Sequence, residues 1–160
     1  MDTAAGDVAA GKVGRAAAPG PEYRTLEVLI GRWMTIGHTF GPDGAPAAPI
    51  TASDIYEWAP GGFFILHTAY GTIGEQGVGG IEMIGYDAET GRFRTAFYDS
   101  QGNITREQLS VEGTTLSWAG ADVRCTGTLE DDGRKLVCRH ERREEETWAP
   151  SMDVTLTRVD

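Results

Sequence analysis

The sequence has no long apolar run and few prolines, cysteines or basic residues. No stretch of its 160 residues approaches the roughly 20 apolar residues that span a bilayer. With 7 prolines and 2 cysteines, the chain is neither collagen-like nor a disulfide scaffold. Fourteen basic residues against 24 acidic residues give a net charge of -10, which repels phosphate backbones and anionic lipids. We therefore expect neither a nucleic acid nor a membrane as a partner.

The N-terminal segment is rich in Ala and Gly and holds almost no large apolar side chain. It cannot offset its ordering entropy by burial, so residues 1–20 are predicted to form a disordered tail and residues 21–160 a single domain. Asp2 and Asp7 stand where a secretory signal carries basic residues, and glycines interrupt any apolar segment after them. We expect a cytoplasmic protein.

The rest of the chain reads as antiparallel β structure. Runs of about seven residues rich in β-branched and aromatic side chains alternate with Gly, Asp, Pro and Asn clusters typical of hairpins. Before them, residues 22–30 place apolar side chains at helical spacing and end at Gly31, which predicts a short helix. A long meander has two exposed edges unless it closes. We predict an all-β, antiparallel up-and-down meander barrel of about ten strands, with the N-terminal helix as a plug or lid. The predicted strands are residues 33–40, 50–58, 63–70, 81–86, 93–99, 104–111, 115–119, 123–129, 135–140 and 152–158.

Several motifs support this fold by resemblance. Residues 29–33, Leu-Ile-Gly-Arg-Trp, look like the Gly-x-Trp signature that opens the first strand of lipocalin-like barrels. Together with four later motifs, they resemble an uncharacterised family of bacterial lipocalin-like (calycin) barrels, distantly similar in shape to nitrobindin and fatty-acid-binding proteins. The resemblance implies a barrel with a ligand cavity, and no particular activity. The later motifs are Tyr-Glu-Trp-Ala-Pro-Gly-Gly-Phe-Phe-Ile-Leu-His at 56–67, Ile-Gly-Tyr-Asp-Ala-Glu-Thr-Gly at 84–91, Asp-Ser-Gln-Gly at 99–102 and Met-Asp-Val-Thr-Leu-Thr-Arg at 152–158.

The resemblance also raises the question of haem. Nitrobindin-like barrels bind haem through a histidine near the C-terminal strand, whereas residues 152–158 contain no histidine here. His140, on the preceding predicted strand, is the remaining candidate. We expect no cofactor.

Alternation divides the first strand into two faces that both need burial. The signature Trp of lipocalin-like barrels points inward, so the resemblance implies that Trp33 faces the lumen and that small residues such as Gly37 leave room behind it. The opposite row then faces outward and requires a cover: the helix, the tail or a second subunit. We expect either helix docking or a homodimer. This outward row consists of Met34, Ile36, His38 and Phe40.

Three residues are candidates for acid–base chemistry. His67 lies in an apolar run and titrates near neutrality when unperturbed, but we favour a structural role in which it hydrogen-bonds a cross-strand carboxylate. Glu82, also inside an apolar run, is its expected partner, with a solvent-facing position as the alternative. Asp99 precedes a turn, where capping of the turn amides is favoured over catalysis.

Aromatic residues on the predicted strands suggest a ligand wall. Small-molecule sites are lined mainly by apolar and aromatic side chains with a few polar groups, although simple core filling is an equal alternative. Cys125 and Cys138 are expected to be thiols that point inward as small core residues, without catalytic or zinc-binding roles. The predicted ligand-binding residues are Trp33, Gly37, Tyr56, Trp58, Tyr86, Phe97 and Trp118.

Two functions from different classes follow. The sequence contains no phosphate-binding Gly loop, no nucleophile elbow, no His-Glu-x-x-His and no EF-hand loop, and no metal site is predicted. The first function is binding of a small, mainly apolar metabolite in the lumen. The alternative is a cofactor-free cyclase or isomerase acting on an apolar biosynthetic intermediate, with His67 and a carboxylate as acid and base.

Overall fold

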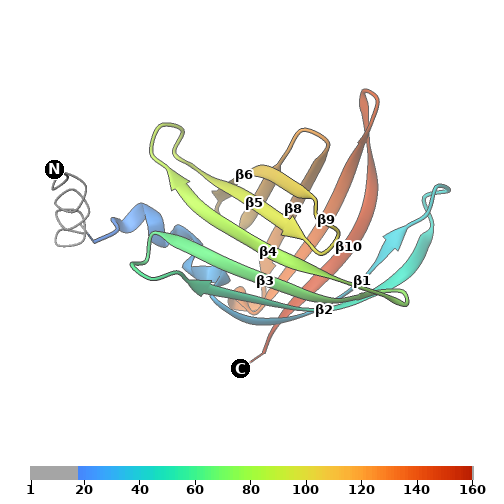
Figure 1. Cartoon of the computed structure of the whole chain (residues 1–160), viewed down its shortest axis with the longest axis horizontal. Coiled ribbons are helices and arrows are strands. Elements are labelled where there is room, and N and C mark those ends of the chain that lie inside the picture. The colour runs from blue at the N-terminus through green and yellow to red at the C-terminus, as the bar shows by residue number, and fades with distance from the viewer. Residues whose placement is uncertain (1–17, 160) are drawn as a thin grey trace, which may run out of the picture.

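The computed structural model describes residues 18–159, so the tail predicted for residues 1–20 lies almost wholly outside the described part. Ten antiparallel strands close into one barrel in which each strand pairs with its sequence neighbours, and β1 pairs with β10 (Figure 1). This confirms the predicted meander barrel and the short helix, which is a 3-10 helix. The elements are η1 (Pro21–Leu29), β1 (Gly31–Phe40), β2 (Pro46–Trp58), β3 (Phe64–Ile73), β4 (Gln76–Asp87), β5 (Arg92–Asp99), β6 (Ile104–Glu112), β7 (Thr115–Ala119), β8 (Val123–Glu130), η2 (Asp131–Gly133), β9 (Lys135–Glu144) and β10 (Thr147–Val159).

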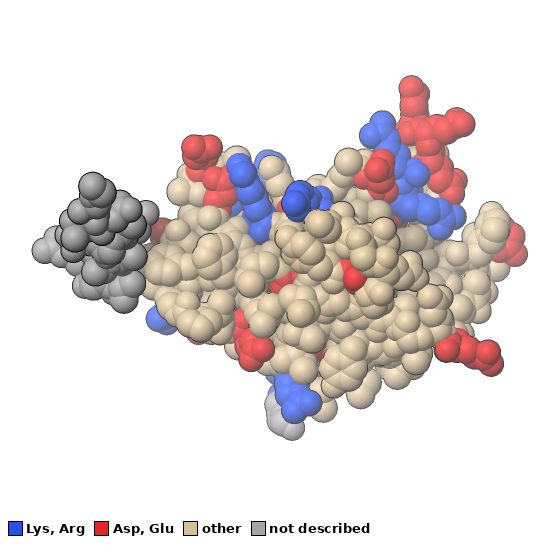
Figure 2. Space-filling model, in the orientation of Figure 1, with Lys and Arg blue, Asp and Glu red and all other residues tan. Residues whose placement is uncertain are grey.

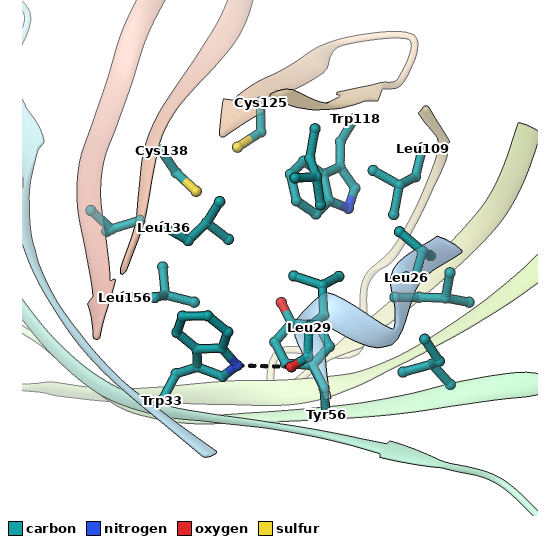
Figure 3. Packing of buried hydrophobic residues seen from close by; sticks show 14 of the residues in the cluster. Leu26, Leu29, Trp33, Tyr56, Leu109, Trp118, Cys125, Leu136, Cys138 and Leu156 are labelled. Atoms are coloured by element: carbon teal, nitrogen blue, oxygen red, sulfur yellow. Dashed lines mark hydrogen bonds between the residues drawn. The ribbon is translucent and has the colours of Figure 1, made fainter. Parts of the chain in front are cut away.

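The helix η1 plugs one end of the barrel, and the β1–β2 and β9–β10 hairpins extend at the other (Figure 1). Leu26 and Leu29 are fully buried, since the helix inserts its apolar side into the barrel core. The Trp33 indole Nε1 donates a hydrogen bond to the Leu29 carbonyl over 2.8 Å (Figure 3). The Arg158 guanidinium donates to the carbonyls of Val28 and Ile30, each over 2.5 Å, and lies 4.2 Å from the centre of the Trp33 ring. The plug is therefore fastened to the first and last strands.

Glycines allow neighbouring strands to approach closely, most of all at Gly37 and Gly71. A Cβ added to Gly37 would lie 1.9 Å from the Asp153 carbonyl oxygen of β10, and one added to Gly71 would lie 2.1 Å from the Thr51 carbonyl oxygen of β2. Both distances are far inside van der Waals contact, so only glycine fits the strongly coiled wall at these points. We had expected Gly37 to leave room behind Trp33. Its role is instead to let β1 and β10 pack closely.

The outward row of β1 is not covered by the helix. Met34 is 42 % exposed and Ile36 is 54 % exposed, while η1 lies against the end of the barrel. The tail lies outside the described residues, and the homodimer stays a prediction. Figure 2 shows that the outer face over β3, β4 and β5 also carries few charges, and its exposed apolar residues are Phe64, Tyr70, Ile81, Met83 and Tyr98.

Of the helices in residues 18–159, none is long and apolar enough to cross a membrane.

Candidate functional site

A cavity of about 490 Å³ occupies the half of the barrel away from η1. Its wall is mainly apolar, with polar side chains converging from β2, β3, β4 and β6. The β5–β6 turn contributes Ser100 and Gln101 to its lining, which places the mouth at the unplugged end. The apolar lining includes Ile50, Phe97, Trp118, Leu136, Val154 and Leu156.

His67 lies at the centre of a buried polar cluster in the cavity wall. Its Nδ1 lies 2.9 Å from Oε1 of Glu82, its direct cross-strand neighbour on β4. Its Nε2 lies 2.7 Å from Oδ1 of Asp54 on β2, and the other Asp54 oxygen accepts a hydrogen bond from the Thr35 hydroxyl. The ring stacks on Tyr56 with centroids 3.9 Å apart and planes inclined by 7°. Both ring nitrogens are thus occupied by carboxylates.

The charge of His67 is set by these two carboxylates. Burial alone would lower the pKa of His67, but the hydrogen bonds and negative charges of Asp54 and Glu82 raise it from 6.5 to about 9. The imidazole is therefore protonated at neutral pH and donates to both acids. Burial raises the pKa of Tyr56 well above 10.0, so its phenol stays neutral beneath the charged ring. The cluster therefore consists of the His67 imidazolium between the side chains of Asp54 and Glu82 inside the barrel.

Glu107 faces the same cavity from β6 without a partner. Within residues 18–159, the structure gives its carboxylate no hydrogen bond and no ion pair. Burial, and secondly the negative charge of Glu82, raise the pKa of Glu107 from 4.5 to about 7. Thr95, its direct cross-strand neighbour on β5, is 4 % exposed, and its hydroxyl oxygen is also without a partner. Glu107 is thus a half-buried carboxylate in the cavity lining with no partner in residues 18–159, whereas Thr95 is buried in the barrel outside that lining.

The opposite wall carries two buried thiols and a neutral histidine. Strand pairing places Cys125 opposite His140 and Cys138 opposite Gly127, so both thiols point into the barrel, as we had expected (Figure 3). The His140 Nε2 lies 3.5 Å from the Cys125 sulfur. A hydrogen bond with Cys138 and burial raise the pKa of the Cys125 thiol far above its ordinary value, and burial lowers the pKa of His140 from 6.5 to about 4. These groups carry no charge at neutral pH.

The charged side chains Asp99 and Arg124 at the mouth of the cavity already have partners within the chain. The Asp99 Oδ1 accepts hydrogen bonds from the backbone N–H groups of Gln101 and Asn103, each over 2.9 Å, so Asp99 caps the β5–β6 turn. These hydrogen bonds, that from Asn103 foremost, lower the pKa of Asp99. The Arg124 Nε lies 2.9 Å from Oε1 of Glu141. Asp99 is thus placed as a turn residue at the rim.

The predicted site residues divide between the two ends of the barrel. His67, Glu82 and Asp99 line the cavity, as do the predicted ligand-binding residues Tyr56, Phe97 and Trp118. The others lie outside its lining: Trp33 holds the plug, Gly37 lies against β10, and Trp58 and Tyr86 pack on the core. Tyr86 belongs to an aromatic group around Tyr23 of η1, with ring centroids 5.1 Å apart. Three of the residues predicted for the ligand wall therefore lie at the closed end, whereas Gly37 lies farther along β1, opposite Ile50 of the cavity lining.

Sequence reasoning missed the polar residues that complete the site. Asp54 lies two residues before the buried Tyr56 on β2, and Glu107 lies two residues before the buried Leu109 on β6. Each acid therefore points to the inside of the barrel. The signal was present, because an acid in a row with buried apolar residues is unusual. Extending the alternation from Tyr56 to Asp54 would have found the second partner of His67.

Two of the three histidines, His67 and His140, line the cavity. His67 has both ring nitrogens bonded to carboxylates and offers no free nitrogen to haem, whereas the Nε2 of His140 lies 3.5 Å from the Cys125 sulfur. The strand β10 contains no histidine. Within residues 18–159, no group of three or more His, Cys, Asp or Glu residues is arranged to hold a metal ion.

A closed ten-stranded antiparallel meander with a helical plug at one end and a cavity at the other defines an up-and-down β-barrel. Within that class, the chain belongs to the family described as "Protein of unknown function (DUF1579)", whose model matches residues 18–158. The chain matches none of the curated proteins.

Solved structures support the same fold. The crystal structure of Rv2717c from M. tuberculosis is 15 % identical with a TM-score of 0.65, over 88 % of this chain and 99 % of that chain. The S-type phycobiliprotein lyase CPES from Guillardia theta is 8 % identical with a TM-score of 0.52, over 89 % of this chain and 99 % of that chain. At these identities the likeness concerns the fold alone.

Proposed function

We propose that the protein binds a small, mainly apolar molecule in the barrel lumen. The cavity carries this proposal: its volume of about 490 Å³ falls in the range of roughly 300–1,000 Å³ typical of small-molecule sites. Phe97, Trp118 and Leu136 supply apolar surface, and a few polar groups converge on the same space. Binding of this kind requires a lumen open at one end, and the plug η1 closes only the other.

The alternative function, a cofactor-free cyclase or isomerase, is not favoured by the geometry of His67. A general base needs an unprotonated nitrogen within reach of the substrate, whereas both nitrogens of His67 already bind carboxylates. Its pKa of about 9 also keeps the ring protonated at neutral pH. A reaction in this cavity would have to use another group of the lining, such as Glu107 or the neutral His140, and no observation defines a substrate for either. Binding is therefore the function that the site supports best.

Filling the cavity tests the proposal. Ala52 lines the cavity from β2, so Ala52→Trp places an indole in the lumen, whereas Ala96→Trp places the same side chain on the outer face of β5. The probe is 1-naphthalenemethanol, an uncharged bicyclic molecule, titrated by calorimetry. We expect the probe to bind the native protein and Ala96→Trp with similar affinity. For Ala52→Trp we expect an affinity at least about 10-fold lower, because the introduced indole fills part of the cavity that the probe needs.

Two results would contradict the proposal. One is the absence of binding to the native protein. The other is equal loss of affinity in both Trp variants, which would place the probe outside the lumen. Melting temperatures of the three proteins serve as the control for folding.

A further inference from the structure

The charges that line the cavity are predominantly negative. The polar cluster places Asp54 and Glu82 around a single imidazolium, and Glu107 adds a third carboxylate. Arg124 is the only Arg or Lys in the cavity lining within residues 18–159, and it is bound to Glu141 and stacked at 4.4 Å over the Trp148 ring. An anionic ligand would therefore meet repulsion without an available cation, whereas a cation would meet unbalanced negative charge.

Glu107 is the one carboxylate of this set that is not already bound. Asp54 and Glu82 each contact His67, while Glu107 lines the cavity and has no partner in residues 18–159. Glu107 is half-buried and lines the cavity, so a ligand in the lumen can supply the partner that the described residues do not. An ammonium group supplies up to three hydrogen-bond donors and one positive charge, and the Glu107 carboxylate lacks both a donor and a counter-ion.

We infer that the ligand is an apolar amine, bound as its ammonium ion with Glu107 as the counter-ion and its apolar body against Trp118 and Phe97. This inference rests on the proposed binding function and adds the chemical class of the ligand. A proton balance follows from it. Glu107 has a pKa of about 7 in the ligand-free barrel, and a neighbouring ammonium stabilises the ionised form. When the ammonium binds near pH 7, Glu107 becomes ionised, and each protein molecule in which it was protonated releases one proton.

Three probes of one shape separate charge from apolar contact: 1-naphthylmethylamine as its ammonium ion, uncharged 1-naphthalenemethanol, and 1-naphthoate. At about pH 8, above the pKa of Glu107, we expect the ammonium to bind the native protein about 10-fold more tightly than the alcohol, and the carboxylate to bind most weakly. In Glu107→Gln, the preference for the ammonium over the alcohol disappears. The matched control is Glu57→Gln, which removes a carboxylate from the exposed outer face of β2 and leaves the preference intact.

Calorimetry in two buffers of different ionisation enthalpy gives an independent readout. At about pH 7, the native protein releases protons on binding the ammonium, whereas Glu107→Gln releases none. If the alcohol binds but the ammonium is not preferred, or the carboxylate binds best, the amine inference is overturned and the binding function stands. If none of the three probes binds, the binding function fails and the amine inference fails with it.

Discussion

His67 combines burial, a positive charge and two carboxylate partners. Removing one member of such a cluster leaves charges in a low-dielectric environment without compensation. Tyr56 contributes a ring face parallel to the imidazolium, which stabilises the cation further. At the scale of the residue, His67 ties β2, β3 and β4 together beside the cavity.

The substitution His67→Gln tests this structural role. The pKa of His67 is about 9 in the folded protein against 6.5 for an ordinary histidine, so its stabilising contribution is complete below pH 6.5 and is lost as the pH rises through 9. We expect His67→Gln to lower the free energy of unfolding by about 3–5 kcal/mol below pH 6.5 and by much less above pH 9. Urea denaturation at both pH values measures the difference. His38→Gln, on the outer face of β1, is the matched control, and an equal deficit for His67→Gln at both pH values would contradict a charged His67.

The partnership of His67 with Glu82 could be predicted because the residues lie in consecutive apolar strands that pair directly. Asp54 and Glu107 were harder to predict, since Glu107 lies between Arg106 and Gln108 and only the alternation along each strand places either acid inside the barrel. Trp33 was predicted to contact a ligand but binds the helix instead, because the sequence does not show which end of the barrel the helix closes. Composition and alternation do not contain that information.

At the scale of the element, the glycines explain both the shape of the wall and the errors in strand length. The predicted third and fourth strands stop at residue 70 and begin at residue 81, but β3 runs to Ile73 and β4 begins at Gln76. The intervening segment is rich in glycine, which weakens the β pattern. Gly71 and Gly79 are required there because a Cβ would meet the backbone of the neighbouring strand at 2.1 Å and 2.5 Å.

A pair of glycine substitutions tests the close approach of β1 and β10. Gly37→Ala places a methyl group 1.9 Å from the Asp153 carbonyl oxygen, so the strands must separate, and we expect a loss of about 1–3 kcal/mol in the free energy of unfolding. Gly77→Ala is the control, since nothing lies within 4 Å of its added Cβ, and its effect should stay within about 0.5 kcal/mol. Denaturant titration of both variants compares them. Equal stability of the two would show that β1 and β10 are not as close as described.

At the scale of the whole molecule, the two ends of the barrel have different roles. The closed end buries Leu26, Leu29 and Trp33 and holds the helix by hydrogen bonds from Trp33 and Arg158. The other half keeps a cavity with an acidic interior, and the outer face along β3, β4 and β5 carries few charges (Figure 2). The closed barrel and its plug could be predicted from hairpin chemistry and the edge-strand argument, because both depend on patterns local in sequence. The position and charge of the cavity depend on side chains from most of the strands and could not.

Crystals soaked with 1-bromonaphthalene show whether the lumen is open and binds apolar molecules. Bromine scatters anomalously, so its position is located without modelling the rest of the ligand. We expect one strong anomalous peak inside the barrel, between Phe97, Trp118 and Leu136, with η1 still in place at the closed end. Anomalous peaks confined to the outer face of the barrel, or a lumen filled by side chains with no peak, would contradict binding in an open lumen.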